Sequence, residues 1–484
     1  MPSSSALSPQ TLEQGAPLAA LLERLRSRFE DRFSASQALR EQHGRGESHH
    51  TPSIPDAVIF AETTWEVSDI VCLCAEAGVP VIPYGTGTSL EGHLTALHGG
   101  VSIDLSRMTK ILRVGAQDLD CTVEAGATRE QLNTHLRDTG LFFPIDPGAN
   151  ASLGGMAATR ASGTNAVRYG TMRENVLSMT VVLPSDEIIR TGGRARKSSA
   201  GYDLTRLFVG SEGTLGIITE VTLRLYGVPE TMSAALCSFP SVEQAVAAAI
   251  AVVQVGIPVA RMKLMDRGLI DAVNRYSSLS LDVEDTLAFE FHGSPAAVAE
   301  QVEMVAAIVE ENGGRDFAFA STPEERNRLW KARHNAFYAV VSQRPNAKGW
   351  SSDVCVPVSE LAGCILMTRE LLKGCSVPAA ILGHVGGGNY HVVFAVDPQN
   401  KAELDEVAAI NKAMVHHAIS VVGTSTGEHV VGTGKIGYLR REHGDGVDLM
   451  GGHQGRHRSP GHHEPRQDPA RRRLPKPVVM HTRP

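Results

Sequence analysis

The sequence predicts an α+β fold in which two principal domains follow one another, and three observations support this. The chain has 484 residues, of which 42% are hydrophobic, so it can form two or three domains with cores of their own. Helical and strand patterns alternate from about residue 55 onward. After residues 227–229 the pattern changes to two successive strand–helix–strand units, which is typical of a ferredoxin-like second domain.

The elements before residue 229 are expected in a simple order. Residues 18–32 have apolar side chains at helical spacing with charges opposite, which is typical of a surface helix. Thr63 and Glu66 have the spacing of a capping box and predict a helix to about residue 77. The segments GVPVIPYG, VSIDL and CTVEAG are strands, VVLPSDEIIRT is a hairpin around residues 184–187, and IITEVTLRLY is a long strand over 217–226.

The second domain begins with the two units. Strand MSAALCSF, helix SVEQAVAAAIAVVQV and strand VARMKLMD form the first, and LAFEFHG, PAAVAEQVEMVAAIVEEN and DFAFA form the second. We therefore divide the chain into an N-terminal helical segment (1–50), a first domain (51–228), a second domain (229–395), C-terminal helices (396–450) and a tail (451–484).

Charge and cysteine content exclude several classes of protein. The net charge is −7, and because residues 451–484 carry +6, the remainder carries −13, which argues against nucleic-acid binding. The seven cysteines form no CxxC motif, so we expect reduced thiols and a cytoplasmic location. We expect neither a membrane-spanning run nor a secretory signal in MPSSSALSPQ, and at most peripheral association with the inner membrane.

Three glycine-rich segments precede residue 229: PYGTGTSLEG (83–92), PIDPGANASLGGMAATRASGTNAVRYG (144–170) and FVGSEGTLGIIT (208–219). The first is no dinucleotide fingerprint, because Leu90 stands where GxGxxG needs glycine, and no P-loop, because GK[ST] is missing. Free backbone N–H groups in such segments can bind a pyrophosphate, and small side chains let the backbone approach a large flat ligand. Taken alone, the first segment is equally well a simple turn.

The segment GHVGGGNYH (383–391) places two histidines around three glycines. A helix would separate His384 and His391 by two turns, and a straight strand would put them on opposite faces. A turn at residues 386–388 would bring them together, with Glu428 arriving from another segment. Two imidazoles and one carboxylate suit zinc or another divalent ion, although the residues alone favour structural histidines.

Together these motifs resemble a known family. PYGTGTSLEG, DPGA with GG and ASG after it, RYGTMRENV and GSEGTLGIITE resemble the FAD-binding half of vanillyl-alcohol-oxidase-type flavoproteins. LWKARHNAFYA, SSDVCVPVSEL, GHVGGGNYH and STGEHVVGTGK resemble the FAD-linked D-lactate dehydrogenase branch, the D-2-hydroxyacid dehydrogenases. The resemblance covers about residues 50–450 and implies a two-subdomain FAD-binding domain with a ferredoxin-like cap that binds substrate.

The resemblance also implies roles for individual residues. It implies that a divalent metal, zinc or manganese, is held by His384, His391 and Glu428. It makes His429 the base, lets Arg333 clamp the substrate carboxylate through a bidentate pair, and has Asn389 bind substrate or orient a ligand. The residues implied to contact FAD are Pro83, Gly85, Thr86, Gly87, Thr88, Ser89, Gly92, Pro147, Gly148, Ala149, Ser152, Gly154, Gly155, Ala158, Ser162, Gly163, Tyr169, Gly170, Val176, Glu212, Gly213, Gly216, Ile217 and Ile218.

The implied reaction is oxidation of a D-2-hydroxy acid, above all D-lactate to pyruvate, by hydride transfer to FAD with metal-assisted deprotonation of the hydroxyl. No nicotinamide fingerprint is present, so electrons are expected to pass to a cytochrome, quinone or electron-transfer protein. Glycolate or D-2-hydroxyglutarate is the alternative substrate. Two alternatives of other classes are a hydrolase that uses the metal without redox chemistry and a catalytically impaired flavin or metal binder.

Two positions and the tail depart from the family. Gly387 stands where the family usually has aspartate, and losing a carboxylate that orients a metal-bound imidazole lowers affinity or activity about 10–100-fold. Val430 stands where the family has glycine, a position whose backbone we expect to be special. Codons permitted for residues 452–469, read from their second base, encode AIKAAIDPQGIMNPGKI, which resembles the family's usual C-terminal end, so we expect a frameshifted, disordered tail over 451–484.

Overall fold

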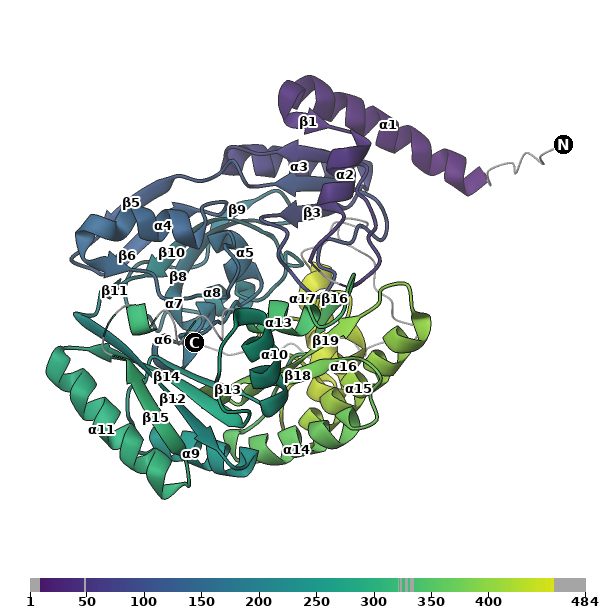
Figure 1. Ribbon diagram of the computed structural model, residues 1–484. Helices are drawn as coiled ribbons and strands as arrows, with labels where there is room; N and C mark the ends of the chain where they lie inside the picture. Colours follow the sequence, from purple (N-terminus) through teal and green to yellow (C-terminus); the bar gives the residue numbers. More distant parts are fainter. Residues whose placement is uncertain are drawn as a thin grey trace, which may run out of the picture.

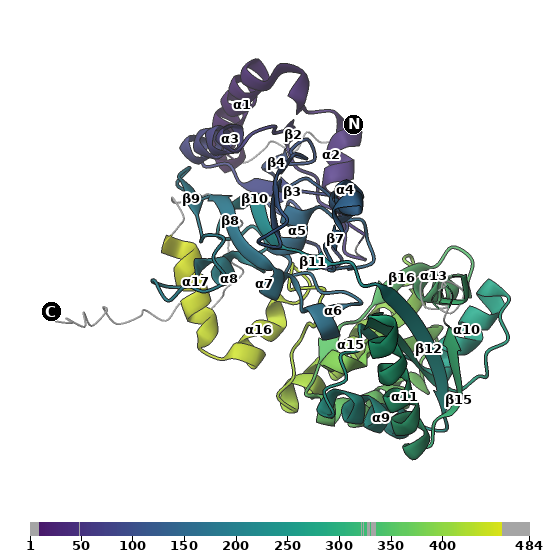
Figure 2. The ribbon, with the colours of Figure 1, turned by 90° about the vertical axis from the view of Figure 1, so that its left-hand side faces the viewer.

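The computed structural model describes residues 9–47, 49–320, 322, 324–326, 330 and 335–456. Figure 2 shows two lobes, one built from the purple-to-blue elements and one from the teal-to-green elements. We call residues 9–227 the first lobe and residues 231–420 the cap. This is the α+β arrangement of a nucleotide-binding lobe followed by a cap that the motifs predict.

The first lobe starts with a four-stranded sheet of order β1-β2-β4-β3. Its parallel strands are β2 (Ala57–Phe60), β4 (Val101–Asp104) and β3 (Val81–Tyr84), and β1 (Phe33–Ser34) pairs antiparallel at the edge. Helices α1 (Pro9–Phe29), α2 (Gln37–His43) and α3 (Thr64–Ala77) accompany it. The expected cap is present, since the Thr63 side chain accepts a hydrogen bond from Glu66 N.

The second sheet of the first lobe is antiparallel, with order β5-β6-β10-β8-β9. Its strands are β5 (Ile111–Gly115), β6 (Asp120–Glu124), β10 (Ile217–Arg224), β8 (Val176–Val182) and β9 (Ile188–Arg190), so the predicted long strand and hairpin are both found. Short elements surround it: α4 (Arg129–Leu136), β7 (Leu141–Phe142), α5 (Leu153–Ala158), α6 (Ala166–Tyr169), α7 (Met172–Asn175), α8 (Leu204–Phe208) and β11 (Tyr226–Gly227).

The cap is built on one antiparallel sheet of order β15-β12-β14-β13-β18-β19-β16, with β17 paired to β19. Its first four strands come from the two predicted units: β12 (Thr231–Phe239), α9 (Val242–Gln254), β13 (Arg261–Met265), and β14 (Asp285–Gly293), α11 (Pro295–Glu311), β15 (Arg315–Ala320). The sheet continues through β16 (Lys348–Ser351), β17 (Val354–Cys355), β18 (Ala379–His384) and β19 (Asn389–Val396), with α10 (Arg267–Ser277), α13 (Ala336–Val341) and α14 (Leu361–Leu372) packed on it. The glycine-rich motif with its histidines therefore belongs to this sheet (Figure 1).

The last helix of the cap, α15 (Lys401–Ser420), leads into residues 421–435, which we call the return loop, and then into α16 (Ile436–His443) and α17 (Gly446–Arg456). The return loop binds the first lobe: Val431 N and Gly432 N donate to the Glu212 carboxylate, and Thr433 N donates to Glu91 O. Residues 451–456 of the expected disordered tail belong to α17, so the expectation of disorder is wrong for them, and residues 457–484, to which most of the frameshift hypothesis refers, lie outside the described residues. Within the described chain, no helix has both the length and the apolar character needed to cross a bilayer.

Candidate active site between the lobes

A cavity lies between the first lobe and residues 428–430 of the return loop. All three glycine-rich segments reach it. Of the residues expected to bind FAD, those that line it are Pro83, Gly85, Thr86, Gly87, Thr88, Ser89, Pro147, Ala149, Ser152, Gly154, Gly155, Ala158, Ser162, Glu212, Gly213, Gly216, Ile217 and Ile218. The wall is thus made mainly of small residues and backbone.

The glycines in this wall are needed for space. A Cβ on Gly85 would lie 2.3 Å from Ser152 Oγ, and a Cβ on Gly213 would lie 2.7 Å from Pro83 Cγ. A Cβ on Gly154 would lie 2.4 Å from the Cβ of Ala125. We call this wall of small residues the cradle. Larger side chains would close it, so the lining fits a large flat ligand that the backbone approaches closely, as FAD requires.

The remaining expected FAD contacts do not line the cavity: Gly92, Gly148, Gly163, Tyr169, Gly170 and Val176. Several of them make structural contacts instead. Gly163 has φ +139° and packs against the backbone of Asp146, and Val176 is fully buried in the core of the first lobe. Tyr169 OH lies 2.9 Å from His292 Nδ1 of the cap, so it joins the two lobes.

The sequence analysis assigned no FAD contact to the other lining residues Tyr84, Leu90, His93, Leu94, Leu105, Ala125, Ala151, Met156, Thr159 and Ala161. Most are apolar or small and look like core residues in the sequence. His93 follows PYGTGTSLEG directly, and its Nε2 lies 3.0 Å from Glu212 Oε2. Burial alone would raise the pKa of Glu212, but His93 and the N–H groups of Val431 and Gly432 hold it below its usual value.

The two histidines of GHVGGGNYH meet because the motif is a β-hairpin. His384 ends β18, Asn389 begins β19, and Gly388 turns the chain with φ +77°, where a Cβ would collide with Val356 O. The rings of His384 and His391 have their centroids 5.5 Å apart. Glu428 Oε1 lies 3.5 Å from His384 Nε2 and 3.0 Å from His391 Nε2.

This donor set fits a divalent metal. His391 Nδ1 lies 2.9 Å from Ser352 O and must donate to it, so Nε2 is the nitrogen that faces Glu428 and that the neutral ring would offer to a metal. That Nε2 is buried and makes no hydrogen bond within the described chain. Four atoms bound tetrahedrally at about 2.0–2.2 Å from zinc are roughly 3.3–3.6 Å apart, close to the separations found here. The expected ligands His384, His391 and Glu428 are therefore brought together.

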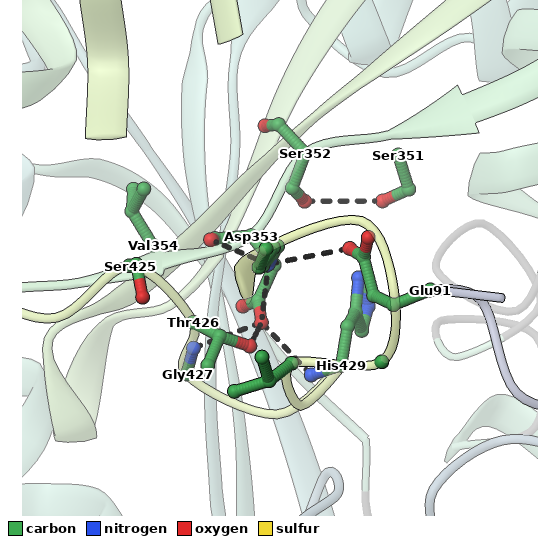
Figure 3. A network of polar contacts seen from close by, with 12 residues as sticks. Glu91, Ser351, Ser352, Asp353, Val354, Ser425, Thr426, Gly427 and His429 are labelled. Carbon is green, nitrogen blue, oxygen red and sulfur yellow. Dashed lines mark hydrogen bonds and ion pairs between the residues drawn. The ribbon is translucent and has the colours of Figure 1, made fainter. Parts of the chain in front are cut away.

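A second cluster, Asp353, His391 and His429, overlaps the first but suits a metal less well. Asp353 Oδ2 already accepts hydrogen bonds from Thr426 Oγ1 at 2.6 Å and from the backbone N–H groups of residues 427, 428 and 429 at 2.8–2.9 Å (Figure 3). Lys435 Nζ adds an ion pair at 3.5 Å. Asp353 thus shapes the return loop rather than offering a free ligand oxygen.

Asp353 is the most important site residue that sequence reasoning leaves unassigned. It is fully buried, and burial by itself would raise its pKa. The charge of Lys435, assisted by His429 and His391, outweighs burial and holds the pKa of Asp353 well below its usual value. Its signal in the sequence is weak, an acidic residue just before the short strand Val354–Cys355.

His429 and Asn389, the two described residues expected to act in catalysis, occupy different places. His429 lines the cavity, stacks on His391 with centroids 5.0 Å apart, and keeps a buried Nδ1 without a partner among the described residues. Burial lowers the pKa of His429, which favours the neutral imidazole. Asn389 donates from Nδ2 to Asp353 Oδ1 at 2.8 Å and to Val354 O at 2.9 Å, so it orients Asp353.

Arg333 lies outside the described residues. Its described neighbours Trp330 and Ala336 pack with Leu382 and Val393 on one side of the cap sheet. Because side chains alternate along a strand, that is also the side that carries His384 and His391.

The two departures from the family pattern have different surroundings. A Cβ on Gly387 would meet nothing within 4 Å, so a larger residue fits there. Val430, on the cavity wall, has φ +64°.

Comparison with known proteins identifies the family. A model described as "FAD binding domain" matches residues 55–192, and one described as "FAD linked oxidases, C-terminal domain" matches residues 228–452. The second match ends beside residue 451, where the composition of the chain changes abruptly.

Two relatives illustrate the similarity. The chain is 50% identical to "Probable D-lactate dehydrogenase, mitochondrial" of Danio rerio over 90% of this chain and 89% of the relative. It is 45% identical to "D-lactate dehydrogenase [cytochrome], mitochondrial" of Arabidopsis thaliana over 88% of this chain and 75% of the relative. The expected cytoplasmic location is wrong, because both relatives are mitochondrial by name. Targeting signals are recognised by receptors, and overall composition does not reveal them.

A solved structure supports the fold alone. P-cresol methylhydroxylase with bound substrate superposes with a TM-score of 0.71 at 16% identity, over 86% of this chain and 90% of that chain. This confirms the predicted α+β fold of the vanillyl-alcohol-oxidase type with a C-terminal cap. With both family models matched in order and half of the aligned residues shared with one relative, the chain belongs to the FAD-linked D-lactate dehydrogenase family.

Proposed function

We propose that this chain oxidises D-lactate to pyruvate with FAD and passes the electrons to a cytochrome. One observation carries the proposal: the return loop is held by Asp353 on one side and Glu212 on the other, so that Glu428 and His429 face the flavin cavity. The names of the Danio rerio and Arabidopsis thaliana relatives support the substrate, and the latter supports the acceptor.

The cradle of small residues and the histidine hairpin define where the groups are held. FAD bound in the cradle would accept the hydride from C2 of the substrate. A divalent ion held by His384, His391 and Glu428 would polarise the substrate hydroxyl and lower its pKa. The cradle lies between the first lobe and the return loop, whereas the metal ligands His384 and His391 come from the cap sheet and meet Glu428 of the return loop. Glu428 and the adjacent His429 both line the cavity.

His429 is the base in this proposal. Its imidazole takes the proton of the substrate hydroxyl while the C2–H bond breaks, the hydride passes to FAD and the carbon–oxygen double bond of the 2-oxo acid forms. Two observations support this role: His429 lines the cavity, and burial favours the neutral ring that can accept a proton. Asp353 positions His429 by accepting the hydrogen bond from its backbone N–H at 2.8 Å.

Substrate selection is assigned to Arg333, which would bind the carboxylate through two parallel hydrogen bonds, each contributing about 1.5–3 kcal/mol. The described residues do not include Arg333, so this role rests on the motif KARHNAF. Glycolate and D-2-hydroxyglutarate share the hydroxy-acid group and are the competing substrates.

The test is an absorption spectrum of the purified protein under anaerobic conditions. We expect a yellow protein that D-lactate bleaches fully, with L-lactate inactive and glycolate or D-2-hydroxyglutarate slower. The variant His429→Asn should also be yellow, and D-lactate should bleach it about 10²–10⁴-fold more slowly than the wild type.

The other outcomes separate the alternatives. A colourless protein with hydrolytic activity indicates a metal hydrolase, and a yellow protein that no hydroxy acid bleaches indicates a non-catalytic flavin binder. Reduction of cytochrome c by the D-lactate-reduced enzyme, compared with reduction of a quinone analogue, identifies the class of acceptor.

A further inference from the structure

A buried lysine reaches the histidine hairpin from the neighbouring strand. In the pairing of β13 with β18, Leu264 lies opposite Gly383 and Met265 opposite Leu382, which places Lys263 opposite His384. Lys263 is only 1% exposed. Lysine is almost never buried this deeply without partners, so its ammonium group is held by the contacts of this site.

The key contact is between Lys263 Nζ and His384 Nε2, which are 3.0 Å apart. An ammonium group can only donate hydrogen bonds, so His384 Nε2 must accept with its single lone pair. The same Nε2 lies 3.5 Å from Glu428 Oε1 and is the atom of His384 that faces the candidate metal position. One lone pair cannot serve the ammonium group and a metal ion at the same time.

The positive charge of Lys263 also opposes metal binding, as does its use of the His384 lone pair. An ion bound about 2.0–2.1 Å from His384 Nε2 would be no more than about 5 Å from the ammonium nitrogen as it stands here. At that distance a divalent cation and an ammonium group repel each other, and burial of Lys263 weakens the screening by water. The second buried lysine of the site, Lys435, faces Asp353 and Glu91.

We propose that Lys263 competes with the divalent ion for His384 and thereby sets how tightly this chain holds its metal. Without metal, Lys263 holds His384 in the tautomer that has its proton on Nδ1. Metal binding requires the ammonium group to release Nε2, so the ion is held weakly and exchanges readily. This inference rests on the metal site of the proposed function, whose ligands are His384, His391 and Glu428.

The test measures metal affinity, not turnover. The FAD-loaded full chain is treated with a chelator, and Mn²⁺ binding is titrated by electron paramagnetic resonance of the free ion and Zn²⁺ binding by calorimetry. The variants are Lys263→Met, which removes the charge at similar length, Lys263→Arg, which keeps it, and Glu428→Gln, which removes a ligand. Flavin absorbance and thermal unfolding establish that each variant is folded, and Lys263→Gln replaces Lys263→Met if the latter fails to fold.

We expect Lys263→Met to bind both ions at least tenfold more tightly than the wild type, Lys263→Arg to bind them no more tightly, and Glu428→Gln to lose binding. If Lys263→Met matches or falls below the wild type while Glu428→Gln loses binding, the metal site stands and the role of Lys263 is overturned. If neither the wild type nor Lys263→Met binds an ion, the metal site itself is wrong, and the competition proposed here falls with it.

Discussion

Replacing Val430 by glycine should stabilise the protein, because Val430 has φ +64°, in the left-handed region. A side chain with a branched Cβ is strained there by about 1–2 kcal/mol. Glycine adopts this backbone freely but loses about 0.5–1 kcal/mol through its greater freedom in the unfolded chain. The expected net gain is therefore about 0.5–1 kcal/mol, or roughly 1–4 °C in Tm.

The chain offers a matched control in Val422, which has φ +63° and is 88% exposed. Val422→Gly removes the same strain without touching the cavity, so both glycine variants should be stabilised in the FAD-free protein, as measured by thermal unfolding. Since Val430 lines the cavity and Val422 does not, only Val430→Gly should also change the dissociation constant for FAD.

A third variant separates strain from side-chain volume. Val430→Ala keeps a Cβ at positive φ and therefore most of the strain, so it should gain little. The reasoning is refuted if Val430→Gly is no more stable than Val430→Ala, or if Val422→Gly loses stability.

Three further outcomes follow from single contacts. Gly154→Ala should weaken FAD binding at least tenfold by fluorescence titration, because the new Cβ would lie 2.4 Å from Ala125 Cβ and 2.9 Å from its backbone, whereas unchanged affinity would show that the cradle adapts. Asp353→Asn should cost about 1.5–3 kcal/mol of unfolding free energy in urea, since it removes the buried carboxylate that accepts the return-loop hydrogen bonds and leaves Lys435 with Glu91 alone; a loss below 1 kcal/mol contradicts this. Burial raises the pKa of Asp266 to about 6, above the value of about 3.9 in an unfolded chain, so the contribution of Asp266 to stability should fall by up to about 3 kcal/mol as the pH rises from 4 to 7. Asp266→Asn should lack this fall, so its advantage in Tm should grow over that range; an equal difference at both pH values would count against the assignment.

Local pattern was sufficient for the elements and for the histidine motif. The helix cap at Thr63, the strand beginning at Ile217 and the two strand–helix–strand units depend on neighbours a few residues apart, and all are found. The turn at Gly386–Gly388 that brings His384 and His391 together is of the same kind, because the positive φ at Gly388 is a local requirement.

The motifs predicted that a flavin cavity exists, but they were a weaker guide to which residues line it. Tyr169 and Val176 stand in RYGTMRENV, a motif expected to contact FAD, yet one joins the lobes and the other is in the core. A run of sequence passes through several environments, and only packing decides which side chain faces the ligand.

The sequence by itself determined the fold class, the order of the elements, the family and the three residues that can ligate a metal. The tertiary structure decided how Asp353 and Glu212 hold the return loop from opposite sides and how Lys263 reaches His384 across 121 residues of chain. These contacts join charged side chains to backbone N–H groups and to an imidazole, on strands and loops that meet only in the folded chain. Their partners are chosen by sheet register and by the loss of water, neither of which leaves a periodic trace in the sequence.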